Sequence, residues 1–474
     1  DVYKRQIQDA LHGTSCSVSD ATRAVILAAA MPNLMDRIGE HDWWDLLGTV
    51  QEFRDGILHR DSTHPAVLIG GAELGLTLAW ALRSLPSCRR LAVRGLDALK
   101  SWCQQGELCV TSVLERPGDV RCVLASVLRL HRLLSAIGSD NDLSSVLGNK
   151  RVKTIGKRRD QLESVGRELA TWAAALTREN GTQALTAISR KEAKDDVGDD
   201  GLLMKAADLD KDTLVPTMQA AVGRGTTKGR LAWQISLPES MLHDDEAKLA
   251  CLLPEWDVRR AAAVVDYRDE CLALELTSGK HPIIDGRCES TIVVDGDERE
   301  PVGRWLATCE YSDDDVHYIE LERAHQGGYV LQRQVMVLRE ERCCMLADAV
   351  VRGQFDSVGG PRDQSKNATP PGAKNPEIEY QARFPLADSI QVKECPETTE
   401  MFLAMQKGER TENTKLQAMV LPLAAHEWRR GDSRSRLQVA DDGQLLTFAR
   451  GRGQIYCPLW FDFNRKRFHS KRTW

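Results

Sequence analysis

The spacing at which apolar residues recur changes near residue 228, and this change limits the folds open to the chain more than any other feature. Before it, apolar residues recur at helical spacing, as in the stripe Trp43, Leu46, Leu47, Val50, Phe53 and Ile57. After it, apolar and polar residues alternate as they do in strands, as at Leu272, Leu274 and Leu276. We therefore predict an α-helical domain over residues 7–190 and a β domain over residues 228–474.

The strands of the β domain follow one another with no helix between them. Gly327 and Gly328 turn the chain into a strand over residues 329–338, and a charged turn at residues 339–342 leads into another over residues 343–351. Strands joined by such short turns run antiparallel, whereas parallel strands need a long crossover. The pattern predicts a large antiparallel β-sandwich, and the strand-like stretch before Trp474 predicts that this domain is C-terminally truncated.

The helical half contains several amphipathic segments separated by short loops, and such helices pack as successive antiparallel hairpins. Residues 191–227 are interpreted as a linker, because residues 191–212 are rich in Lys, Asp and Gly and have weak periodicity. Residues 1–6, DVYKRQ, resemble a translated sequencing-adapter remnant of metagenomic reading frames, so they are left out of the fold prediction. We accordingly expect the chain to be a fragment.

Composition narrows the range of partners. The chain has 474 residues and a formal net charge of −6, which offers no global attraction to nucleic acid. No stretch approaches the ~20 apolar residues that cross a bilayer, so no membrane span is predicted. The 13 cysteines are an odd number, which leaves at least one unpaired. Reduced thiols are the favoured interpretation, and a disulfide framework or a zinc site remains the alternative.

The order of these parts resembles the heparinase II/III-like family of polysaccharide lyases. The similar segments are ACLLPEW at residues 250–256, residues 275–296, and VLQRQVMVL at residues 330–338 followed by MLADAV at residues 345–350. In the last pair, Arg333 and Asp348 are similar to the family's sandwich signature, although ordinary strand alternation also explains them. The resemblance implies an incomplete α/α toroid followed by an antiparallel β-sandwich.

The resemblance also implies β-elimination on an acidic, uronic-acid-containing polysaccharide. Such a reaction needs a Tyr or His base, a Tyr or His acid, and a group that neutralises the substrate carboxylate. His64, which precedes a helix, is the catalytic candidate of the helical half. The catalytic candidates of the sandwich are Tyr267, Tyr311 and His317. The substrate-binding candidates are Arg333 and His281. The sequence departs from the family because no tyrosine stands between Gln6 and Asp266.

That departure keeps a second function open, in which a diverged, non-catalytic member of this architecture binds a glycan or another partner. A hydrolase with paired carboxylates is a third alternative. The basic stretch at residues 465–472 suits an acidic polysaccharide, and it suits protection of an edge strand equally well. No cofactor is predicted, and although the family allows a structural divalent metal, no His or Cys spacing demands one.

Two acidic runs are interpreted without a metal, namely residues 313–315 as a solvated turn and residues 243–246, HDDE, as the charged start of a helix.

The family implies a periplasmic or secreted protein, whereas the cysteine usage favours the cytoplasm. The sequence leaves the compartment and the oligomeric state open.

Overall fold

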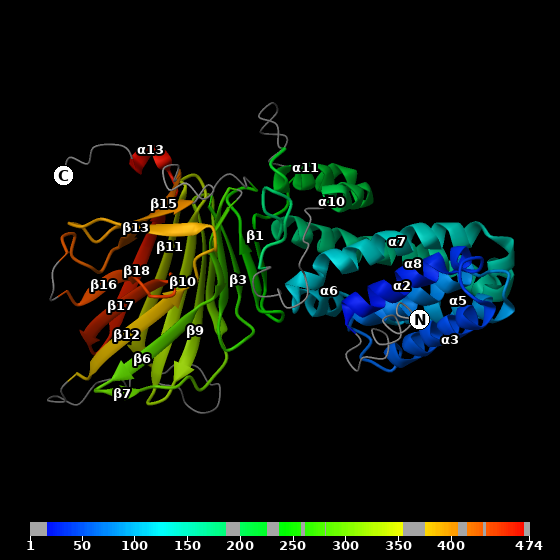
Figure 1. The fold of residues 1–474 in the computed structure, drawn as a ribbon, viewed down its shortest axis with the longest axis horizontal. Coiled ribbons are helices and arrows are strands. Elements are labelled where there is room, and N and C mark those ends of the chain that lie inside the picture. Colours follow the sequence, from blue (N-terminus) through cyan, green and yellow to red (C-terminus); the bar gives the residue numbers. More distant parts are fainter. Residues whose placement is uncertain are drawn as a thin grey trace. The chain divides into compact units, whose positions relative to one another are not determined.

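The computed structural model describes residues 17–185, 200–224, 237–256, 261–279, 281–353, 375–405, 415–429 and 433–468. The adapter-like residues 1–6 lie outside this part of the chain. The chain divides into a helical unit, Asp1–Ala174 with Asp199–Met218, and a sandwich unit, Ala175–Gly198 with Gln219–Trp474. Each unit is considered by itself (Figure 1).

The helical unit is built from helices of varied length joined by short turns. Their bounds are α2 (Val18–Leu34), α3 (Glu40–Ile57), the π-helix η1 (Val67–Glu73), α4 (Leu74–Ala81), α5 (Pro86–Cys103), α6 (Glu107–Leu114), the 3-10 helix η2 (Pro117–Asp119), α7 (Val120–Ser139), α8 (Asn141–Ala175), α10 (Asp200–Ala206), the 3-10 helix η3 (Ala207–Leu209) and α11 (Lys211–Ala221).

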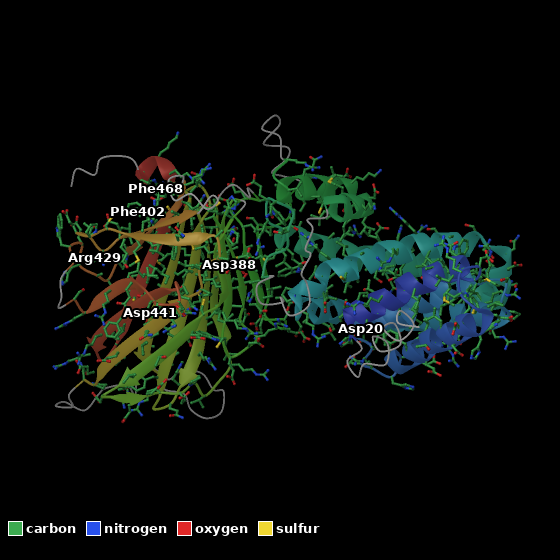
Figure 2. All side chains as sticks on the ribbon, in the orientation of Figure 1. Asp20, Asp388, Phe402, Arg429, Asp441 and Phe468 are labelled. Atoms are coloured by element: carbon green, nitrogen blue, oxygen red, sulfur yellow. The ribbon has the colours of Figure 1, made fainter. Side chains whose placement is uncertain are left out.

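Helix boundaries follow from local chemistry. Helix α2 begins with a capping box, in which Ser17 Oγ accepts a hydrogen bond from the Asp20 amide at 3.1 Å and the Asp20 carboxylate accepts one from the Ser17 amide at 3.2 Å (Figure 2). The apolar stripe predicted from Trp43 to Ile57 lies on α3 and is buried. Gly70 of η1 leaves room for Ile57, because a Cβ there would lie 2.2 Å from Ile57 Cδ1.

The predicted linker at residues 191–227 differs from the structure in secondary structure. Its described part contains α10, η3 and α11, and Leu209 of η3 packs so closely on Gly166 of α8 that a Cβ there would lie 2.8 Å from the leucine. The many Lys and Asp residues of this segment lowered its apparent periodicity. Apolar contacts hold these short helices on the unit nonetheless, since Leu203 and Leu214 are buried.

The sandwich unit contains three antiparallel sheets. Their strand orders are β1-β2-β3-β4-β5, β13-β14-β15-β18-β11-β10-β9-β8 and β16-β17-β12-β6-β7. The strands are β1 (Met241–Asp244), β2 (Leu249–Leu252), β3 (Ala261–Asp266), β4 (Ala273–Ser278), β5 (His281–Arg287), β6 (Glu289–Val294), β7 (Asp297–Glu298), β8 (Leu306–Ser312), β9 (Val316–His325), β10 (Tyr329–Leu338), β11 (Cys343–Arg352), β12 (Glu377–Phe384), β13 (Ile390–Glu394), β14 (Met401–Met405), β15 (Lys415–Pro422), β16 (Ser435–Val439), β17 (Leu445–Arg452) and β18 (Ile455–Asp462), and the short helix α13 (Arg465–Phe468) follows.

One hydrophobic core joins the three sheets. Strands β9, β10, β11 and β18 are neighbours in the eight-stranded sheet (Figure 1), and each contributes alternate residues to this core, such as Ile319 and Leu321 of β9. On β10 these inward residues include Leu331, Val335 and Val337, and Tyr380 and Phe384 of β12 reach the same core from another sheet. The predicted fold class, a helical domain followed by an antiparallel β-sandwich, is confirmed.

Three smaller features of the sequence can also be compared with the structure. Residues 243–246 are the end of β1 and a turn, where the sequence had suggested a helix start. The twelve cysteines of the described chain are all free. Within the same residues, no helix is long and apolar enough to cross a membrane.

Candidate functional site

Arg333, a substrate-binding candidate, lies in the sandwich core and is 1% exposed. Its guanidinium donates two hydrogen bonds to Asp348, from Nε at 2.7 Å and from Nη2 at 3.0 Å. The Tyr380 hydroxyl donates to the same carboxylate at 2.5 Å. The neighbouring Asp348 carboxylate holds the pKa of Arg333 above its ordinary value although burial alone would lower it. The guanidinium is thus held in the core, away from any solvent-borne ligand.

His317, a catalytic candidate, is buried at the inner side of β9 and is 1% exposed. Its two ring nitrogens each lie 2.9 Å from a serine oxygen, Nε2 from Ser240 Oγ and Nδ1 from Ser312 Oγ. Burial, with the positive charge of Arg339 nearby, lowers the pKa of His317 to about 4. The imidazole is therefore neutral at neutral pH and is bonded to two neutral hydroxyls.

This burial predicts a pH-dependent stability. Below its ordinary pKa of 6.5, His317 binds a proton in the unfolded chain before it does so in the folded protein. The stabilisation is complete above pH 6.5 and declines as pH falls, by about 2.5 kcal/mol at pH 4.5. We expect His317→Gln to weaken this decline, measured by urea unfolding of both proteins at pH 7 and pH 4.5. An equal decline in the variant would contradict the assignment.

Tyr311, a further catalytic candidate, cannot share a site with His317. Tyr311 pairs with Tyr318 across β8 and β9, whereas His317 pairs with Ser312, so the two candidates lie on opposite faces of the sheet. Tyr311 is 53% exposed, and its hydroxyl donates to Asp313 Oδ2 at 2.7 Å. This hydrogen bond raises the pKa of Tyr311, which keeps the hydroxyl protonated.

His64, the catalytic candidate of the helical unit, is partly buried in the segment between α3 and η1. Its Nδ1 accepts a hydrogen bond from the Ala66 amide at 3.1 Å, which turns the ring toward the start of the following helix. Burial, and then the positive charges of Arg116 and Arg60, lower the pKa of His64.

Tyr267, the last catalytic candidate, belongs to a chain of polar side chains that the sequence analysis missed. The Tyr267 hydroxyl lies 2.6 Å from His243 Nε2 and 3.0 Å from Asp245 Oδ1, and His243 Nδ1 lies 2.7 Å from Glu310 Oε2. We call Glu310, His243, Tyr267 and Asp245 the proton chain. Tyr267 is fully buried and the His243 side chain is 7% exposed, whereas the Glu310 and Asp245 side chains are 50% and 62% exposed, so the two buried residues connect two acids at the surface.

The proton chain has two consistent hydrogen-bond arrangements. In one, His243 donates from both ring nitrogens, to Glu310 and to the Tyr267 oxygen, while Tyr267 donates to Asp245. In the other, the Tyr267 hydroxyl donates to a neutral His243 and no longer donates to Asp245. Burial, followed by the hydrogen bond to Asp245, raises the pKa of Tyr267. The tyrosine hydroxyl therefore keeps its proton in both arrangements. The two arrangements differ by one proton on His243 and by the acceptor of the Tyr267 hydroxyl.

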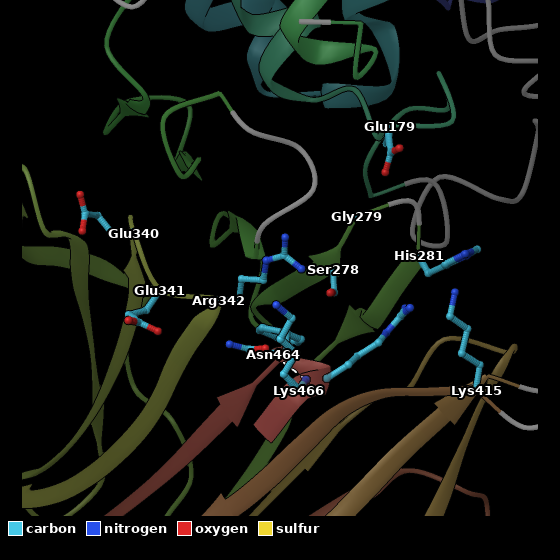
Figure 3. A pocket seen from close by; sticks show the side chains of 12 residues that line it. Glu179, Ser278, Gly279, His281, Glu340, Glu341, Arg342, Lys415, Asn464 and Lys466 are labelled. Atoms are coloured by element: carbon cyan, nitrogen blue, oxygen red, sulfur yellow. Dashed lines mark hydrogen bonds between the residues drawn. The ribbon is translucent and has the colours of Figure 1, made fainter. Parts of the chain in front are cut away.

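A groove of about 800 Å³ lies at another place on the sandwich unit, and we call it the basic groove. Four cationic side chains line it together with the predicted substrate-binding residue His281; the four are Arg342, Lys415, Arg465 and Lys466. Figure 3 shows Arg342, Asn464 and Lys466 close together and Lys415 reaching toward His281, while Glu340 and Glu341 lie at one side. The groove thus gathers positive charge from β15, α13 and the turn before β11.

The electrostatics of the basic groove favour an anion. Burial, and then the positive charge of Arg342, lower the pKa of Arg465. Two guanidinium groups that disfavour each other's charge are stabilised by an anion placed near both. Three acidic residues, Glu179, Glu340 and Glu341, also line the groove, and Glu341 forms an ion pair with Arg467. The arrangement suits carboxylate or sulfate groups, which arginine binds with paired hydrogen bonds.

The proton chain and the basic groove are separate sites. Ala273 of β4 pairs with Asp266, beside Tyr267, whereas Ser278 at the other end of β4 pairs with both Ala261 and His281. Five residue steps along a strand span about 17 Å. Tyr267 and His281 therefore cannot contact the same glycosidic bond, and only an extended ligand reaches both.

In the described part of the chain, no group of three or more His, Cys, Asp or Glu side chains could hold a metal ion. The acidic residue Asp313 instead accepts hydrogen bonds from the amides of Asp315 and Val316, each at 2.9 Å.

Comparison with known proteins bears on the fold. No protein-family model matches the chain, and no curated protein matches it in sequence. A crystal structure of heparinase III aligns with a TM-score of 0.56 and 10% identity, over 94% of this chain and 69% of that chain. A mutant of heparan sulfate lyase HepC from Pedobacter heparinus aligns with a TM-score of 0.53 and 9% identity, over 94% and 68%. The fold is heparinase-like.

A third solved structure, a heparinase III gene product with methylated lysines, agrees, with a TM-score of 0.51 and 8% identity over 94% of this chain and 67% of that one. The heparinase-like architecture therefore extends over both units, and the similarity at these identities concerns the fold alone. Which side chains of this chain bind and react depends on its own geometry.

Proposed function

We propose that the protein binds an acidic, uronic-acid-containing polysaccharide in the basic groove of its sandwich unit. The observation that supports this most is the convergence of Arg342, Lys415, Arg465 and Lys466 on one groove of about 800 Å³. A groove of this size is in the range of small-ligand sites, so it suits a few sugar units of a longer chain.

The groove's chemistry supports an anionic sugar over a neutral one. Lysine ammonium groups and arginine forks donate to carboxylate and sulfate oxygens, and these charge-assisted bonds are about twice as strong as neutral ones. Among the other lining residues, Ser278, His281 and Asn464 carry hydroxyl, imidazole and amide groups that suit sugar hydroxyls. Because all four cations stand at exposed positions, binding should weaken with rising salt.

Charge reversal in the groove tests the proposal. We expect Arg342→Glu with Lys415→Glu to weaken binding of heparan sulfate or alginate by about a hundredfold, since about 1.4 kcal/mol for each charge is a factor of ten. Affinity would be measured by titration calorimetry at two salt concentrations. Arg436→Glu, an exposed reversal on β16 outside the groove, is the matched control. Equal affinities of the double variant and the control would refute the groove as the binding site.

A second candidate function is cleavage of that glycan by β-elimination, as a heparinase II/III-like lyase. The proton chain favours it, because His243 can exchange one proton and stands between the half-exposed Glu310 and the buried Tyr267. In this proposal His243 transfers the proton, and Tyr267 is a positioning residue that orients its ring. Where β-elimination is undetectable, the protein is the non-catalytic binding member that the tyrosine-free residues 7–266 suggest.

A further inference from the structure

The outward face of the eight-stranded sheet carries a continuous row of aromatic and other apolar side chains. Cross-strand pairing joins Tyr311 to Tyr318, Tyr318 to Met336, Met336 to Met345, and Met345 to Trp460, which pairs with Leu421. These residues alternate with the inward residues of the core, such as Ile319 and Phe461, so they point away from it. We call the six residues the aromatic row; they lie on β8, β9, β10, β11, β18 and β15.

A polar network lies next to the aromatic row on the same face. The Tyr318 hydroxyl donates to Glu320 Oε2 at 2.6 Å, and Gln334 Nε2 donates to the same oxygen at 2.9 Å. The Tyr456 hydroxyl donates to Gln334 Oε1 at 3.2 Å, and Gln332 Nε2 donates to Glu322 at 2.8 Å. Tyr456 is 49% exposed, so an aromatic ring and fixed hydrogen-bonding groups face solvent together.

The charge of this face differs from that of the basic groove. Among the outward residues of β8, β9, β10, β11 and β18 there is no Lys or Arg. The charged ones are Asp462, which forms an ion pair with Arg467, and the two glutamates Glu320 and Glu322. Both carboxylates already accept hydrogen bonds from neighbouring side chains. The face therefore repels an acidic glycan and offers little uncompensated charge to a cation.

The exposed face has a defined limit beyond the aromatic row. Phe402 of β14 contacts Phe468 of α13 edge to face, with ring centroids 6.3 Å apart (Figure 2). Helix α13 packs on β15, so it covers that end of the sheet and leaves the aromatic row beside it.

We propose that this outward face binds an uncharged polysaccharide chain. The apolar faces of sugar rings pack on aromatic rings, while their hydroxyls replace water on amide and carboxylate groups. The aromatic row and the polar network supply both kinds of contact side by side on a sheet, which suits an extended chain. Tyr311 is exposed and the other five residues of the aromatic row are half-buried, and apolar patches bordered by polar groups mark interaction surfaces. This surface works independently of the basic groove, so either proposal can fail alone.

Affinity electrophoresis of the full chain tests the proposal, with uncharged glycans in the gel: hydroxyethylcellulose, galactomannan and xyloglucan. We expect the wild type to be retarded by at least one of them, and Trp460→Ala and Tyr456→Ala each to weaken that retardation by about tenfold. Trp44→Ala, an exposed aromatic truncation in the helical unit (47% exposed), is the matched control and should change nothing. Tyr456→Phe keeps the ring and should keep most of the affinity, which separates stacking from misfolding.

Other outcomes overturn the proposal. The proposal is wrong if none of the three glycans retards the wild type. It is also wrong if the variants Trp460→Ala, Tyr456→Ala and Trp44→Ala are retarded equally. A concentration-dependent dimer in sedimentation velocity that both sheet variants abolish would assign the face to a second copy of the chain. Binding of a polylysine peptide that both variants abolish, without glycan retardation, would assign it to a cationic partner.

Discussion

Replacing Arg333 by Met is expected to lower the free energy of unfolding of the sandwich by about 3–5 kcal/mol, because it leaves the buried Asp348 carboxylate without its counter-charge. Asp348 is 3% exposed and receives both guanidinium bonds as well as the Tyr380 hydroxyl. The Arg333 guanidinium also lies 5.2 Å from the centre of the Phe384 ring, so the substitution removes a cation–π contact too. Urea unfolding followed by circular dichroism and tryptophan fluorescence would measure the loss.

The double variant Arg333→Met with Asp348→Leu is the control, because replacing both members of a buried ion pair with apolar residues of similar size is often nearly neutral. We expect it to recover most of the lost stability. A single variant within about 1 kcal/mol of the wild type would contradict the structural role. If Arg333→Met instead leaves the stability unchanged and weakens glycan binding, the result would support the substrate contact that the sequence suggested for Arg333.

Replacing His243 by Gln is expected to reduce any β-elimination activity by about a hundredfold or more, since positioned acid–base groups contribute about that much. Tyr267→Phe should have a smaller effect and should shift the pH profile of kcat, because the ring of His243 loses the hydroxyl 2.6 Å from its Nε2. The rate would be followed as ultraviolet absorbance of the unsaturated product from heparan sulfate, alginate and chondroitin.

Tyr329→Phe, a buried tyrosine of the same core at 6% exposure, is the matched control and should leave the activity unchanged. Full activity of His243→Gln would remove the proton chain from the mechanism. If the wild type releases no unsaturated product from any of these glycans, the second candidate function is contradicted for these substrates. The proposed binding function is unaffected by that result.

The placement of Arg333 shows what the sequence could have predicted. The alternation over β10 puts Arg333 in phase with Leu331 and Val335, which are core residues, and Asp348 is in phase with Leu346 and Val350. The alternation along the two strands therefore indicated that Arg333 and Asp348 form a buried ion pair, whereas their charges suggested that both lie at the surface. The same argument separates Tyr311 from His317, because their partners Tyr318 and Ser312 follow from the register of one hairpin.

The proton chain and the basic groove could not be derived in the same way. His243 meets Tyr267 and Glu310 across 24 and 67 positions of sequence, and no local pattern encodes such pairing. The HDDE run also suggested a helix start, because acidic residues are common there. Arg342 and Lys415 meet only when the turn before β11 and the start of β15 reach the same groove. The sequence analysis did single out two parts of the groove, namely His281 and the basic stretch at residues 465–472, which contributes Arg465 and Lys466.

The central claim is that an acidic polysaccharide occupies the basic groove, and amine labelling with and without the glycan tests it most directly. The protein would be acetylated at low reagent concentration, alone and with a heparan sulfate oligosaccharide, and each lysine followed by mass spectrometry. The account predicts that the glycan protects Lys415 and Lys466, which line the groove, and leaves the exposed Lys153 of α8 as reactive as before. Unprotected Lys415 and Lys466 under saturating oligosaccharide would contradict it.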